Sequence, residues 1–189
     1  MDFNQTLTAH GGLQMNETRD VDLSLENYWE VVCHDSNGVE KWREKNKNLV
    51  TTAGANYILS GGLDGGTQIT AWYVGLKNTG TAVIADTMAS HSTWTEIVHT
   101  TKYSETVRQT LTLGSVTGTT TSSIDNVGNL ATFSMNDTST VAGAFVVSNN
   151  ATSSATAGTL YGVVDFGSSR AVISGDTLTV TVTLTAKTA

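Results

Sequence analysis

The chain has 189 residues, of which 14% are charged, and its formal net charge at pH 7 is −7. This acidic balance excludes binding to nucleic acid through a broad basic surface. A single cysteine, Cys33, excludes an intrachain disulfide, so packing or assembly must stabilise the fold. Threonine is the most frequent residue, and its β-branched side chain suits strands that keep a hydroxyl-rich face in water.

The N-terminus shows neither a basic start nor an apolar run, so no secretory signal is expected. Residues 1–26 follow no sustained hydrophobic period and predict an extended arm, which either stays disordered or orders against a partner. Phe3, Leu7 and Leu13 are its candidate contact residues. No stretch approaches the ~18 apolar residues of a membrane-spanning helix, and no membrane partner is expected.

A β-hairpin is predicted for residues 27–47. Its turn signal is "DSNG", in which Asn37 and Gly38 suit positive φ angles. Trp29 and Trp42 are expected near-opposite each other across the hairpin, and both are further candidates for contact with another subunit. Because an isolated two-stranded hairpin is marginally stable, it should dock on a larger body.

Residues from about 48 to 60 form the one good helix candidate. Apolar side chains recur there at roughly i, i+4 and i+8, and Gly61 and Gly62 form a stop signal. Strands and turns are predicted for the rest of the chain, with the tracts 117–123 and 149–158 as solvated loops. The expected strands are 67–76, 92–99, 104–118, 128–136, 140–149, 158–167 and 176–186.

The closing strand alternates without a break. Leu178, Val180, Val182 and Leu184 share one face because side chains in a strand alternate with a period of two, and the intervening threonines share the other. The apolar face predicts one wall of a core. With its neighbours, the strand predicts a mainly β domain over residues 27–189, an antiparallel β-sandwich of Ig-like or jelly-roll type.

Motifs for catalysis or metal binding are not apparent. The four histidines form no HxH or HExxH arrangement, Cys33 has no companion cysteine, and no serine lies in a GxSxG elbow. The glycine-rich "GGLDGG" lacks the Lys-Ser/Thr of a phosphate loop. We therefore expect no catalytic residue, no cofactor and no enzymatic activity.

Glu96 and Arg108 are a candidate structural ion pair. They fall on two predicted strands joined by a short turn near residues 100–103, in a segment that is otherwise poor in charge. If the strands pair, the two side chains face each other, either as a half-buried pair that fixes strand register or as an exposed cross-strand pair.

Several segments between residues 28 and 186 together resemble small β-sandwich proteins of tailed-phage particles. They include "WYVGL", "DTMASHSTWTE" and "SGDTLTVTVTLT". The resemblance is to head decoration, or cement, proteins. It implies a non-enzymatic homo-oligomer, made in the host cytoplasm, that binds the major capsid protein on the virion surface. Phe3, Leu7, Leu13, Trp29 and Trp42 would then be capsid or subunit contacts.

A second hypothesis is a carbohydrate- or receptor-binding β-sandwich module of a tail or fibre. Such a module uses exposed Trp and Tyr side chains together with Asn and Asp hydrogen bonds.

Overall fold

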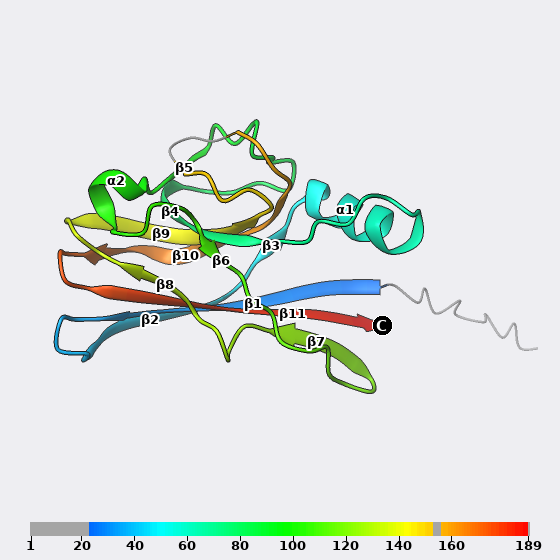
Figure 1. Ribbon diagram of the computed structural model, residues 1–189, viewed down its shortest axis with the longest axis horizontal. Coiled ribbons are helices and arrows are strands. Elements are labelled where there is room, and N and C mark those ends of the chain that lie inside the picture. Colours follow the sequence, from blue (N-terminus) through cyan, green and yellow to red (C-terminus); the bar gives the residue numbers. More distant parts are fainter. Residues whose placement is uncertain (1–22, 153–155, 189) are drawn as a thin grey trace, which may run out of the picture.

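Two antiparallel sheets packed face to face make up the computed structural model, which describes residues 23–152 and 156–188 (Figure 1). The expected β-sandwich is confirmed. Its first strand begins at Leu23, so the last four residues of the segment expected as an arm belong to a sheet. Phe3, Leu7 and Leu13 lie outside the described residues.

The first sheet, sheet A, has the order β2-β1-β11-β7, and β8 also pairs with β11. β7 and β8 follow one another along the same edge of β11, opposite its second and first halves respectively. β7 lies partly within the tract 117–123, which the sequence predicted as loop. The strands of sheet A are β1 (Leu23–His34), β2 (Glu40–Lys47), β7 (Thr121–Asp125), β8 (Ala131–Ser134) and β11 (Thr177–Thr188).

The second sheet, sheet B, has the order β3-β10-β9-β4-β5, and β6 also pairs with β4. The strand expected over residues 104–118 contracts to the two residues of β6. The strands of sheet B are β3 (Leu49–Val50), β4 (Tyr73–Gly80), β5 (Trp94–Glu96), β6 (Gln109–Thr110), β9 (Ser139–Val147) and β10 (Leu160–Val172).

The hairpin β1–β2 forms as predicted, but with a different register. Trp29 pairs with Asn46 and Trp42 with Cys33, so the expectation that the two tryptophans oppose each other is wrong. The turn itself lies at the predicted residues, with Asn37 and Gly38 at its centre. The Asp35 carboxylate fixes it by accepting hydrogen bonds from the backbone N–H groups two and four residues later, and a hairpin centred there cannot oppose the two tryptophans.

The helix α1 (Thr52–Leu63) begins later than expected because Leu49 and Val50 pair with β10. Thr51 is its N-cap, and the Thr51 hydroxyl accepts the N–H of Gly54 at 3.1 Å. A second, four-residue helix, α2 (His99–Lys102), follows β5. In the described residues, no helix has the length and apolar character needed to cross a membrane.

The main core lies between the sheets. Leu178, Val180 and Val182 of β11 are fully buried, and Leu184 packs against the edge of the same cluster, which confirms the predicted apolar face. The intervening threonines are half-buried on the outer face of sheet A. Each of the large buried aliphatic side chains contributes ~1.5–3 kcal/mol relative to exposure.

A smaller core covers the outer face of sheet B. Phe145 and Val147 of β9 and Val163 of β10 pack there beneath Met88, from the connection that follows β4, and Trp94 of β5. Figure 1 shows this connection arching over β4 and β9. β9 therefore has both faces covered, which is why its sequence is a nearly continuous apolar run.

Candidate interaction surface

The outer face of sheet A is the open face of the sandwich, since a connecting segment covers the outer face of sheet B. Alternation along β1 places Trp29 and Val31 in the core, so Glu26, Tyr28 and Glu30 point outward. Register then defines the neighbours on this face. They are Lys47, Lys45 and Arg43 on β2, and Thr181, Thr183 and Thr185 on β11.

Glu26 is held between two lysines from opposite sides of β1. Its Oε1 lies 2.8 Å from Lys47 Nζ on β2, and its Oε2 lies 2.5 Å from Lys187 Nζ on β11. Hydrogen bonds from Lys187 and Lys47 lower the pKa of Glu26 to about 2. The carboxylate therefore remains charged and fixed down to strongly acidic pH.

Glu30 is the second carboxylate of this row. It forms ion pairs with Arg43 and with Lys45, the latter at 3.1 Å, and Arg43 also pairs with Glu40 at 2.7 Å. Burial raises the pKa of Glu30, but the hydrogen bonds from Arg43 and Lys45 outweigh it and leave the pKa below its usual value. The row of charges on this face is thus internally paired.

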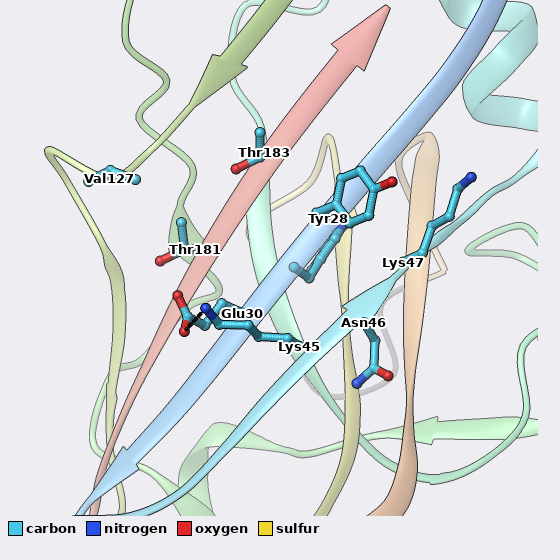
Figure 2. A pocket seen from close by; sticks show the side chains of 9 residues that line it. Tyr28, Glu30, Lys45, Asn46, Lys47, Val127, Thr181 and Thr183 are labelled. Atoms are coloured by element: carbon cyan, nitrogen blue, oxygen red, sulfur yellow. Dashed lines mark ion pairs between the residues drawn. The ribbon is translucent and has the colours of Figure 1, made fainter.

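A shallow hollow of about 390 Å³ lies within this face (Figure 2). The Tyr28 ring stands in it with 51% of the residue exposed. Figure 2 shows the ion pair of Glu30 and Lys45 on one side of the hollow and Val127, from the connection between β7 and β8, at its far edge. Its lining also includes Trp29, Asn46, Lys47, Thr181 and Thr183.

The two tryptophans proposed as contacts, Trp29 and Trp42, point to the inner face of sheet A and not to this outer face. Trp29 borders the hollow but packs in the core and is only 2% exposed, so it offers a partner almost no surface. Trp42 faces the inside of sheet A, where its ring meets Phe166 edge-on at 6.1 Å and its Nε1 donates to the carbonyl of Ala171 at 3.2 Å. Both rings share the inner face because Trp29 lies on the same side of β1 as the buried Cys33, and Trp42 is paired with Cys33.

Glu96 and Arg108 form a buried, bidentate ion pair. Arg108 Nε donates to Glu96 Oε1 and Arg108 Nη2 to Oε2, both at 2.8 Å, and the two side chains are 0% and 4% exposed. A third donor, Nη1, reaches the carbonyl of Asn149 at 2.8 Å. The guanidinium also stands 5.2 Å from the centre of the Phe145 ring.

The route to this pair differs from the prediction. β5 and β6 do not pair with each other; each pairs with a different part of β4. The chain between Glu96 and Arg108 leaves the sheet through α2 and Tyr103 before it returns. The pair therefore closes a loop of the chain and ties it to β9, instead of fixing the register of two neighbouring strands.

The other side chains considered for chemistry have structural surroundings. Burial raises the pKa of the Cys33 thiol to about 12, which makes it a poor nucleophile. His91 stacks on the Trp94 ring at 4.0 Å and lies 3.2 Å from the Trp94 carbonyl oxygen. Within residues 23–152 and 156–188, no group of three or more His, Cys, Asp or Glu side chains could hold a metal ion.

Sequence reasoning missed the charged row on sheet A, although a signal for it exists. Arg43, Lys45 and Lys47 recur with a period of two, and Glu26 and Glu30 stand four residues apart, which also places them on one face of a strand. Once two such strands pair, opposite charges at facing positions attract. A turn centred on Asn37 and Gly38 already places Glu30 opposite Lys45.

The fold and this surface define an antiparallel β-sandwich with one open, charge-paired face. Comparison of the chain with protein-family models, with curated proteins and with solved structures finds no match.

Proposed function

We propose that this protein is a non-enzymatic structural component of a tailed-phage particle that binds the major capsid protein through the outer face of sheet A. The observation that carries the proposal is that this face is open and already ordered, with Tyr28 exposed between paired charges. The segments "WYVGL" and "SGDTLTVTVTLT", which resemble those of head decoration proteins, give it its particle context.

The ordered state of this face favours adhesion. Lys45 and Lys47 are held by carboxylates before any partner arrives, so docking immobilises fewer free side chains. An exposed aromatic ring that becomes buried at the centre of a contact is a common hot spot. Tyr28 is placed for that role.

The proposed function is mechanical reinforcement of the capsid. Copies of a stiff sandwich that lie across junctions between capsid subunits bury additional area at each junction. The shell then resists the outward pressure of packaged DNA. In this proposal the protein is made in the host cytoplasm, assembles as a homo-oligomer on the virion surface and uses no cofactor.

Binding to shells that lack the protein tests the role of this face. Tyr28→Ser should reduce the bound amount at subsaturating concentration by more than ~10-fold, since an aromatic anchor contributes 2 kcal/mol or more. Ile84→Ser is the matched control, because Ile84 is 59% exposed on the segment that covers sheet B. Equal binding of the Tyr28 variant and the wild type would remove sheet A from the contact. Wild-type protein that binds no shell would refute the capsid role.

A second candidate function is favoured by the same ring. The hollow around Tyr28 combines an exposed aromatic face with hydrogen-bonding groups of Glu30, Lys45, Thr181 and Thr183, which suits a sugar. A glycan array separates the two proposals. Hits that disappear in Tyr28→Ser, without binding to shells, would favour a receptor-binding module over a decoration protein.

A further inference from the structure

The apolar inner face of sheet A continues past the end of sheet B. On β11, Val182 is fully buried, whereas Leu184 and Ala186, which face the same way, are only half-buried. Figure 1 shows β1 and β11 reaching the same end of the molecule, where α1 lies on the other layer. The core of the sandwich is therefore open at this end.

This opening contains two adjoining hollows of about 220 and 170 Å³, which we call the end groove. The hollows share the side chains of Ile58 from α1, Tyr161 from β10 and Leu184 from β11. Leu25, Val116 and Ile124 also line the larger one, together with Ala186 and the hydroxyl side chains Ser122, Ser123 and Thr185. Val116 is 66% exposed although it borders an apolar surface. Such an uncovered apolar strip is typical of a docking site.

The backbone next to the groove also has room for a strand. β2 ends opposite Tyr28, where Lys47 is its last paired residue. The stretch of β1 from Leu23 to Glu26 therefore pairs with β11 on one side and, among the described residues, has no strand on its other side. An extended segment added at this edge would alternate its side chains between the end groove and the outer face.

The chain itself supplies a segment of suitable composition. Residues 1–22 precede Leu23, and Leu23 lies on β1 two positions before the groove residue Leu25. Leu13 and Met15 stand two positions apart, which places both on one face of an extended strand. We infer that this segment, contributed by a neighbouring copy of the chain, occupies the end groove.

The length and direction of the chain between Met15 and Leu23 favour insertion into the groove of a neighbouring copy over insertion into the groove of the same copy. Seven residues separate Met15 from Leu23, and they include four charged side chains but neither glycine nor proline. In extended form they carry Met15 ~25 Å beyond the end of β1. Gly11 and Gly12, which favour a reversal, precede Leu13 and cannot return it to its own groove. The inference does not rest on the capsid role.

Cysteine pairs test the exchange directly, because Cys33 is buried and its thiol is unreactive. A Leu13→Cys variant is mixed with a Val116→Cys variant under mild oxidation. A disulfide-linked dimer of the two variants is expected. Leu13→Cys mixed with Val39→Cys is the control, because Val39 is exposed in the β1–β2 turn at the opposite end of sheet A. Equal cross-linking in both mixtures would overturn the inference, as would no cross-link in either.

Mass in solution gives a second readout that leaves the sandwich unchanged. The full chain should exceed its monomer mass of 19.9 kDa in light scattering. The variant Leu13→Ser/Met15→Ser should shift toward the monomer, with self-association weakened by more than ~10-fold because two buried apolar side chains are lost. A double variant, Leu13→Cys/Val116→Cys, that closes only within one chain would show that the segment binds its own groove and refute the exchange.

Discussion

Replacing Arg108 with methionine should destabilise the protein strongly. The change leaves the Glu96 carboxylate, which is 4% exposed, without its two charge-assisted hydrogen bonds. Removing one partner of a buried ion pair costs ~3–5 kcal/mol, since the remaining charge is desolvated and unpaired. The lost donor to Asn149 acts in the same direction, within the same order of magnitude.

Urea unfolding followed by tryptophan fluorescence measures this effect. With a slope of ~2 kcal/mol per M, the midpoint of Arg108→Met should fall by ~2 M. Arg43→Met is the matched control, because Arg43 pairs with Glu30 and Glu40 at the surface and exposed pairs contribute ~0–1 kcal/mol.

A double variant separates buried charge from lost packing. Glu96→Leu/Arg108→Met removes both charges, so it should recover much of the stability that Arg108→Met loses. Exposed ion pairs contribute at most ~1 kcal/mol. If Arg108→Met lowered the free energy of unfolding by no more than that, the buried-pair reasoning would be refuted. A double variant less stable than the single one would also refute it.

Three further predictions follow from individual side chains. Cys33, with its pKa raised to about 12 by burial, should resist a thiol reagent at pH 8 in the native protein and react fully in denaturant; rapid native labelling would contradict its placement. Gly54→Ala should lower the free energy of unfolding, measured in urea, by ~1–3 kcal/mol, because the new Cβ would lie 2.1 Å from the Tyr161 carbonyl oxygen. The control Gly62→Ala, on the same helix but in open space, should be neutral or stabilising. Glu26→Gln should lower stability at pH 7, and because the pKa of Glu26 is depressed to about 2, its difference from the wild type should shrink as pH falls from about 4.5 toward 2; a constant difference would argue against the ion pairs.

The ion pair of Glu96 and Arg108 illustrates how far local reasoning reaches. Their opposite charges, in a segment otherwise poor in charge, suggested that the two side chains could pair. The strand pairing assumed for them was wrong, because β4 offers its edge to both β5 and β6 and the chain between them turns through α2. Opposite charges can be matched from sequence, but the path between them depends on which strand is their common neighbour.

The tryptophans show the same limit for a surface. Trp29 and Trp42 were expected to oppose each other and to contact another subunit. The turn at Asn37 and Gly38 instead pairs Trp29 with Asn46 and Trp42 with Cys33, and both rings lie on the inner face that Cys33 shares. This shift of four residues changes the cross-strand partners and keeps the faces, so which face of the hairpin turns inward was decided by its packing on sheet B.

The sequence alone determined the features that depend on hydrophobic periodicity and on residue composition. The alternation of Leu178, Val180 and Val182 with threonine predicted a wall of the core, and the turn residues predicted the hairpin. Tertiary structure alone decided which outer face stays open and where the core ends. Those outcomes depend on how far one sheet extends past the other and on which connection lies over β9. Such long-range contacts produce no periodic pattern in the sequence of the residues that make them.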